Sequence, residues 1–92
     1  MKDKLLKIIN HYGVMKQLKY IHSEYFELDE AIIRYYDMED LGFDLEHIAE
    51  EIADVMVMLK QFQYYFDITD ERIEKIMNEK IDRQLERIEN ED

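Results

Sequence analysis

The sequence predicts an all-α protein, an antiparallel four-helix-type bundle that is completed by oligomerisation. The 92-residue chain has no proline and only two glycines, so few positions favour a turn. Its 47% hydrophobic content is too high for a disordered chain. Apolar residues recur every three or four positions along most of the chain, which is the period of one helix face.

We expect residues 1–92 to form a single domain, because a chain of this length is shorter than most domains. Domains this small bury only about 60% of the surface that the unfolded chain exposes. Association of several copies is a natural way to complete so small a core, and we expect a homodimer or homotetramer.

Two helices are expected in the first half of the chain, with Gly13 between them. The first extends from about Lys4 to Tyr12, and glycine ends it because glycine adopts backbone angles that interrupt helices. The second extends from about Val14 to Tyr36 and has apolar residues at helical spacing. The acidic segment between Asp37 and Asp44 follows it and favours a turn.

Two further helices are expected in the second half of the chain. The third extends from about Leu45 to Phe66, with Asp44 as its N-cap. Its middle, Ile52 to Leu59, is apolar almost all round, so we expect it at the centre of the assembly. The fourth begins near Thr69, a favourable N-cap residue, and extends to about Glu89.

Charge and composition exclude several classes of partner and site. With 23 acidic and 12 basic residues, the formal net charge of −11 repels a nucleic-acid backbone. The charged N-terminus leads into an amphipathic stretch, without the apolar run of a signal peptide or membrane span. No cysteine is present, which excludes a disulfide framework or a thiolate metal site. We therefore expect a cytoplasmic protein that binds neither nucleic acid nor membrane.

Two pairs of carboxylates form the clearest candidate site. Glu24 and Glu27 lie three positions apart on the second expected helix and so share a face, and Glu51 and Asp54 repeat this spacing on the third. Two antiparallel helices joined by a short loop bring both pairs to one pocket. Carboxylate oxygens suit Mg²⁺, with Mn²⁺ as an alternative, and both ions keep positions for water or phosphate oxygens.

Asp54 carries most of this prediction, because it lies within the apolar middle of the third expected helix. Burying a carboxylate there costs several kcal/mol unless the charge is compensated. A metal ion is one compensating partner, and a buried salt bridge to a Lys or Arg of the fourth helix is the alternative. Glu24 and Glu27 alone would be assigned to a solvated helix surface.

A di-iron site of the ferritin type is excluded by spacing. Such a site requires Glu-x-x-His on its helices, whereas Lys19 and Asp44 stand three positions before His22 and His47. We expect both histidines, like His11, to lie at the surface or behind the metal ligands.

The carboxylates resemble the signature of the MazG-like branch of the all-α NTP pyrophosphatase superfamily, which is Glu-Glu-x-x-Glu, a spacer, and Glu-x-x-Asp. The first half reads Ser23-Glu24-Tyr25-Phe26-Glu27, and the second reads Glu51-Ile52-Ala53-Asp54. A third block, Asn78 to Glu89, looks like the family's Asn-x-Lys-Phe-x-x-Arg-Phe element. One position departs from the pattern, because Ser23 stands where the family has its first glutamate.

This resemblance implies a magnesium-dependent pyrophosphohydrolase that converts a nucleoside triphosphate, NTP or dNTP, to the monophosphate and pyrophosphate. It implies that Mg²⁺ or Mn²⁺ is held, and water activated, by Glu24, Glu27, Glu51 and Asp54. It also implies that the substrate is contacted by Lys80, by Arg83 or Arg87, and by Asn78 and Gln17. In the family, paired subunits complete the nucleotide pocket. The alternative, which Ser23 supports, is a non-catalytic helical module that binds nucleotide or another protein.

Overall fold

The computed structural model describes residues 1–37 and 45–91, which form four α-helices. These are α1 (Lys2–Tyr12), α2 (Val14–Asp37), α3 (Leu45–Tyr65) and α4 (Asp70–Glu89). All four expected helices are present, and the all-α class is confirmed. The expected N-cap Asp44 and the rest of the acidic turn lie outside the described residues. In the described part of the chain, no helix has both the length and the apolar character that a membrane crossing requires.

Two helix boundaries follow the sequence directly. Gly13 has a φ of +91°, a backbone angle that glycine adopts without steric cost, and its N–H donates to the Ile9 carbonyl at 2.7 Å, closing the last turn of α1. At the start of α4, the Thr69 hydroxyl accepts a hydrogen bond of 3.1 Å from the Arg72 backbone N–H. Gly13 therefore ends α1 and Thr69 caps α4, as the sequence predicts.

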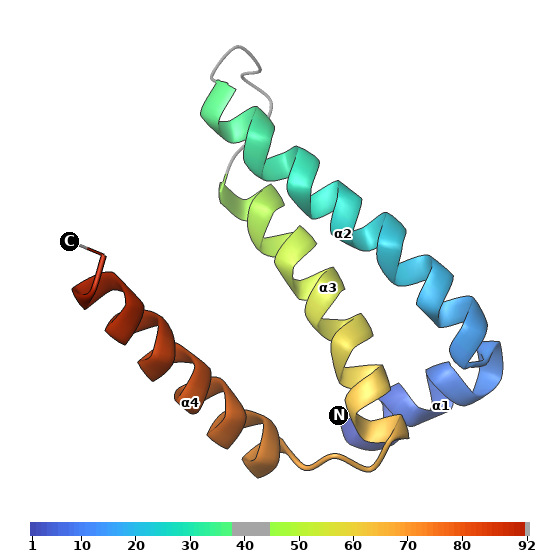
Figure 1. Cartoon of the computed structure of the whole chain (residues 1–92). Coiled ribbons are helices and arrows are strands. Elements are labelled where there is room, and N and C mark those ends of the chain that lie inside the picture. Colours follow the sequence, from blue (N-terminus) through green and yellow to red (C-terminus); the bar gives the residue numbers. More distant parts are fainter. Residues whose placement is uncertain (38–44, 92) are drawn as a thin grey trace.

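The core lies where α1, α2 and α3 meet. Figure 1 shows α2 and α3 side by side as an antiparallel hairpin, with α1 packed across its open end. The buried hydrophobic side chains are few and come from all three helices: Leu5, Ile9, Ala31, Met58 and Tyr64. This small core fixes α2 against α3, and so fixes the carboxylates that the two helices carry.

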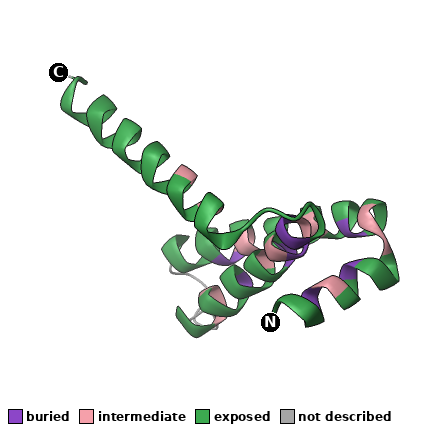
Figure 2. Ribbon diagram, turned by 90° about the horizontal axis from the view of Figure 1, so that it is seen from below, coloured by how far each residue is buried: buried purple, intermediate pink, exposed green. Residues whose placement is uncertain are grey.

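The fourth helix stands apart from the other three. In Figure 1 its ribbon is set apart from the hairpin, and Figure 2 shows it extending away from the rest of the molecule. Across the described residues, α4 does not pack against α1, α2 or α3 and buries none of its own residues. The Cα radius of gyration is 16.5 Å, against about 12 Å for a compact domain of this length. One chain alone therefore does not form the four-helix arrangement.

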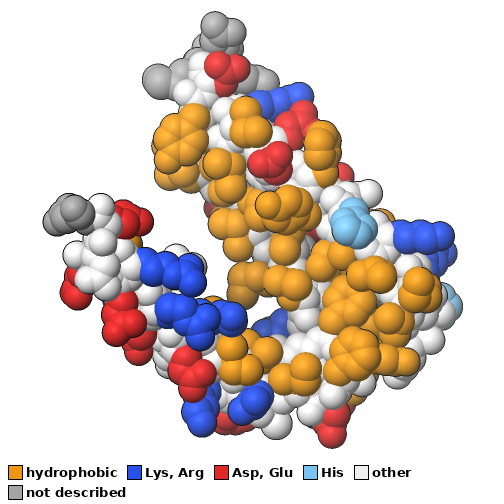
Figure 3. Space-filling model, in the orientation of Figure 1, with side chains coloured by type: hydrophobic (Ala, Val, Ile, Leu, Met, Phe, Trp, Pro, Cys, Tyr) orange, Lys and Arg blue, Asp and Glu red, His pale blue; other side chains and the backbone are white. Residues whose placement is uncertain are grey.

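Large apolar surfaces are left open as a result. In the middle of α3, Ile52, Met56, Val57 and Leu59 are 43–54% exposed. The exposed apolar residues of α4 are Met77, Ile81, Leu85 and Ile88. Figure 3 shows hydrophobic side chains gathered across the visible face of α1, α2 and α3. The central, enclosed position expected for the third helix is not reached within a single chain.

The junction between α3 and α4 is held by Asp70. Its carboxylate accepts hydrogen bonds from Lys60 Nζ at 2.7 Å, Gln63 Nε2 at 2.8 Å and the Tyr64 hydroxyl at 2.9 Å. These donors, Lys60 first, lower the pKa of Asp70 from 3.8 to about 2. The first residue of α4 is thereby tied to the last turns of α3.

Candidate metal centre

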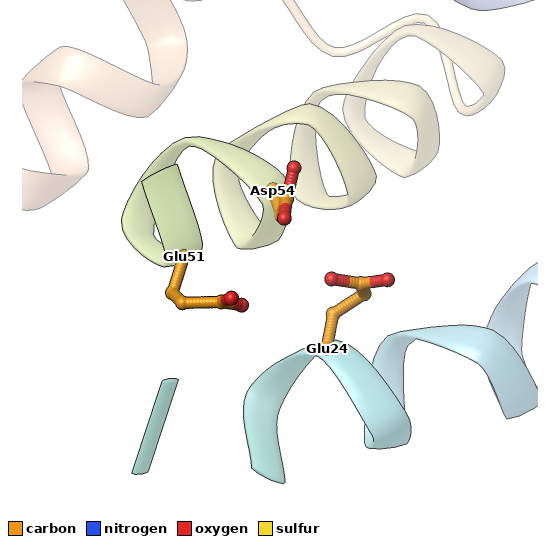
Figure 4. A group of neighbouring side chains, drawn as sticks. All are labelled: Glu24, Glu51 and Asp54. Atoms are coloured by element: carbon orange, nitrogen blue, oxygen red, sulfur yellow. The ribbon is translucent and has the colours of Figure 1, made fainter. Parts of the chain in front are cut away.

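Three carboxylates from two helices converge in the structure. Glu24 of α2 faces Glu51 and Asp54 of α3, and each offers one oxygen such that these oxygens all lie within 4.8 Å of one another (Figure 4). Glu51 and Asp54 share a face because three residues make nearly one helical turn. The antiparallel packing of α2 against α3 then brings Glu24 opposite them.

The burial of these carboxylates differs from the sequence prediction. Asp54, expected to be the costly buried charge, is exposed, whereas Glu24 and Glu51 are only 8% and 9% exposed. The reason is that α4 does not cover this side of α3, so the apolar neighbours of Asp54 are open as well. Among the described residues, no ion pair joins Asp54 to α4, and the alternative salt bridge is therefore not formed within one chain.

The two buried glutamates each carry an oxygen without a partner. Glu24 Oε2 and Glu51 Oε2 are fully enclosed, and neither accepts a hydrogen bond within the described part of the chain. The Tyr20 hydroxyl bonds to Glu24, and His47 Nε2 lies 3.8 Å from Glu51 Oε1. An enclosed polar atom without a partner costs about 1–3 kcal/mol, so this arrangement favours a ligand that supplies positive charge.

Electrostatics point the same way. Burial raises the pKa of Glu24 above its ordinary value of 4.5, and the neighbouring charge of Glu27 raises it further, while the hydrogen bond from Tyr20 opposes both. Burial is also the main cause that raises the pKa of Glu51, followed by the charges of Glu27 and Asp54. A bound cation reverses such shifts, because it favours the ionised carboxylates.

Glu27 is the one predicted ligand that the structure places outside the convergent group. It is exposed on α2 and lines a shallow pocket of about 290 Å³, together with Glu51, His47 and Arg34. It nevertheless lies close enough for its charge to raise the pKa of both buried glutamates. Glu27 is thus a neighbour of the cluster rather than a member of it. Ser23, where the resembling family has a glutamate, is exposed.

The predicted substrate contacts on α4 are not brought to the carboxylates. Asn78, Lys80, Arg83 and Arg87 are all exposed, and α4 is separate from α2 and α3. Lys80 borders a groove on the surface of α4 whose other walls are mainly apolar. Figure 3 shows the basic side chains of α4 at the surface of the helix. Within one chain, these residues do not reach the site.

A cavity of about 470 Å³ opens beside the cluster, with Glu24 and Asp54 in its wall. Gln17, a predicted substrate contact, lies in this wall and donates from Nε2 to Gln61 Oε1 at 2.8 Å. Gln61 and Tyr20 are not among the site residues predicted from the sequence. Spacing alone could have found Gln61, because it lies two turns after Asp54 on the same face of α3. The remaining lining residues are Ile8, Tyr12, Lys16, Tyr20, Val57 and Met58.

Comparisons with known proteins give no match: no family model, no curated protein and no solved structure is significantly similar to this chain. The convergent carboxylates and the adjoining cavity are therefore the features from which a function is inferred.

Proposed function

We propose that this protein is a magnesium-dependent nucleoside triphosphate pyrophosphohydrolase of the MazG-like family. The observation that carries the proposal is the pair of enclosed, unpartnered oxygens, Glu24 Oε2 and Glu51 Oε2, beside Asp54. Three convergent carboxylates are the hard oxygen ligands that Mg²⁺ and Mn²⁺ prefer, with water or phosphate oxygens completing the coordination. The donor set therefore fits the ion that the sequence motif implies.

In the proposed reaction, water attacks the α-phosphorus of the triphosphate, and the bond to the bridging oxygen breaks to release pyrophosphate. When bound, the metal ion neutralises phosphate charge and lowers the pKa of the attacking water. Glu24, Glu51 and Asp54 hold the ion, and Tyr20 orients Glu24 through its hydrogen bond. Glu27 lies outside the ligand group, close to it and exposed, and is the carboxylate that accepts the proton from water.

A second copy of the chain is the proposed partner that completes the bundle, as a homodimer or homotetramer. Two observations support this assembly: a radius of gyration of 16.5 Å, larger than that of a compact domain of this length, and the exposed apolar residues of α3 and α4. A small chain gains stability when it buries such apolar surface against another copy. In that assembly, α4 approaches the carboxylates of another copy. The residues that then contact the triphosphate, in the cytoplasm where such substrates are found, are Asn78, Lys80, Arg83 and Arg87.

The test is a screen of standard and modified NTPs and dNTPs with Mg²⁺ or Mn²⁺, in which monophosphate and pyrophosphate are separated by chromatography. We expect equal amounts of both products from at least one triphosphate, and no reaction after the metal is removed with EDTA. Absence of product from every triphosphate with either metal would overturn the proposal. Nucleotide binding without product release would instead support the non-catalytic module.

A further inference from the structure

The cavity beside the carboxylates contains a pair of buried amides. Gln17 of α2 is 6% exposed and Gln61 of α3 is 2% exposed, and they are joined by the 2.8 Å hydrogen bond from Gln17 Nε2 to Gln61 Oε1. Gln61 Nε2 makes one other contact, a weak hydrogen bond of 3.6 Å to Met58 Sδ. Gln61 is one of the two most completely buried large side chains in the described chain.

This pair is poorly explained by packing alone. A primary amide carries two donor hydrogens and an oxygen with two lone pairs, so most of the hydrogen-bonding capacity of the two side chains is unused. Replacing both members of a buried polar pair by apolar groups of the same shape is often neutral or stabilising. Both glutamines line the cavity beside the carboxylates.

We propose that Gln17 and Gln61 recognise the edge of a nucleobase bound in this cavity, and so determine base specificity. The inference rests on the proposed function, which places the phosphates of the same nucleotide at the carboxylates. With the hydrogen bond from Gln17 Nε2 to Gln61 Oε1 made, the Gln17 oxygen is still an acceptor and the Gln61 amide still has a donor hydrogen. The Watson–Crick edge of a base carries an acceptor beside a donor, whereas phosphate oxygens only accept.

The rest of the cavity suits a flat heterocycle. Ile8, Tyr12, Val57 and Met58 contribute apolar or aromatic surface against which a ring can pack. The volume of about 470 Å³ is within the range of small-molecule sites. Glu24 and Asp54 form part of the same wall, so a base that contacts the amide pair has its phosphates directed toward the proposed metal ligands.

The first experiment tests base binding without any catalytic step. The side-chain NH₂ resonances of Gln17 and Gln61 are followed by NMR while the wild-type protein is titrated with each nucleoside, and separately with Mg²⁺ and inorganic tripolyphosphate. We expect at least one nucleoside to shift both glutamine resonances, and tripolyphosphate to shift resonances near Glu24 and Asp54 instead. If no nucleoside at millimolar concentration shifts either glutamine, the proposal is wrong.

The second experiment tests specificity. In the Q17L/Q61L double variant, we expect the ratio of kcat/KM between the best and the worst base to fall on the order of 10-fold or more, while affinity for Mg²⁺ and tripolyphosphate stays within about 2-fold of wild type. Gln63→Leu is the matched control, because Gln63 is buried on the same helix but does not line the cavity. Its base discrimination should match wild type.

The outcomes separate the two proposals. A double variant that keeps the wild-type ratio overturns base recognition while leaving pyrophosphate release intact. A wild-type protein that releases no pyrophosphate overturns the proposed function, and the nucleoside titration still decides whether the cavity binds a base. If the double variant does not fold, the titration of the wild-type glutamines alone decides whether base recognition stands.

Discussion

The carboxylates at two places in this small protein, Asp70 at one and Glu24 with Glu51 at the other, have opposite surroundings. Asp70, at the junction of α3 and α4, is exposed but accepts hydrogen bonds from three different side chains, and its pKa is lowered to about 2. Glu24 and Glu51 are buried, each leaves one oxygen without a partner, and their pKa values are raised. Ionised carboxylate is stabilised at the first place and destabilised at the second.

The difference distinguishes a structural carboxylate from a candidate ligand. The hydrogen-bond donors that stabilise the Asp70 carboxylate, namely Lys60, Gln63 and Tyr64, all belong to the same chain. The nearest charged neighbours of Glu24 and Glu51 are mainly further carboxylates, which add repulsion to the cost of burial. Folding places these groups together and compensates them only in part, through Tyr20 and His47. Their convergent oxygens are arranged so that they could hold a metal ion.

The largest expected effect is on catalysis, in the Asp54→Asn variant. Removing one of three convergent ligands should lower pyrophosphate release on the order of 100-fold or more. Because Asp54 is exposed, the metal-free protein should keep its free energy of unfolding to within about 0.5 kcal/mol. Glu50→Gln is the matched control, since Glu50 is exposed, is absent from the convergent group and should keep wild-type activity.

The same variant separates the two interpretations of Asp54. If Asp54 is ion-paired in the assembly, losing its charge strands the partner and destabilises the metal-free protein by roughly 3 to 5 kcal/mol. A strongly destabilised variant that still released pyrophosphate at the wild-type rate would remove Asp54 from the site. Chemical denaturation and product assays on the same preparation distinguish these cases.

The next largest effect is stabilisation by metal. An ion that binds only the folded carboxylates adds about 2.7 kcal/mol when its free concentration is about 100 times its Kd. Mg²⁺ or Mn²⁺ should therefore raise the melting temperature by several degrees, and Glu51→Gln should abolish most of the increase. The Asp70→Asn variant should keep it, because Asp70 belongs to the other group of carboxylates. A melting temperature that is the same with and without millimolar Mg²⁺ would argue against the metal site.

A smaller effect is the pH dependence of stability. For Glu24 and Glu51, the folded pKa lies above the ordinary 4.5, so the folded state binds more protons over that interval. Stability of the metal-free protein should therefore rise as pH falls from neutral through the folded pKa values, and level off below 4.5. For Asp70 the sign is reversed, and its contribution is lost as pH falls from 3.8 to about 2.

Adding Mg²⁺ tests this prediction further. It should suppress the increase in stability that the buried glutamates give as pH falls, and it should leave unchanged the decrease in stability that comes from Asp70. Denaturation curves between pH 7 and about pH 2, with and without metal, measure both trends. Metal-free stability that stays flat between neutral pH and 4.5 would show that the glutamates are not destabilised by burial and mutual repulsion.

Local signals predicted the helices well. Gly13 ends α1 by adopting a positive φ, and Thr69 caps α4 by accepting a hydrogen bond from a backbone N–H three residues later. Both effects depend only on residues that are close in the sequence. The spacing of Glu51 and Asp54 likewise fixed their common face of α3. The meeting of Glu24 with them required the additional inference that α2 and α3 pack antiparallel, which the structure confirms.

Burial was harder to predict, because it depends on which helices pack together. The apolar neighbours of Asp54 suggested an enclosed position, but α4 does not cover them within one chain. For the same reason, the sequence did not predict that Glu24 and Glu51 are the buried members of the group. Gln61 can be placed on the face of Asp54 by its spacing, but no local pattern predicts its hydrogen bond to Gln17 of α2. The same holds for the hydrogen bond from Tyr64 to Asp70 at the start of α4.

The smallest expected effect is structural and concerns Asp70→Asn. The substitution removes the charge that Lys60, Gln63 and Tyr64 stabilise, and should lower the melting temperature without abolishing pyrophosphate release. Glu71→Gln is the matched control, because both residues lie in the first turn of α4 and lose the same favourable interaction with the helix dipole. The amount by which Asp70→Asn lowers the melting temperature more than Glu71→Gln does then measures the contribution of the hydrogen bonds to Asp70. That difference should shrink as pH falls from 3.8 toward 2, because wild-type Asp70 becomes protonated and then, like Asn, carries no charge. Equal melting temperatures for the two variants at neutral pH would mean that the bonds to Asp70 add nothing to stability, and that the contrast between the two groups of carboxylates rests on the buried glutamates alone.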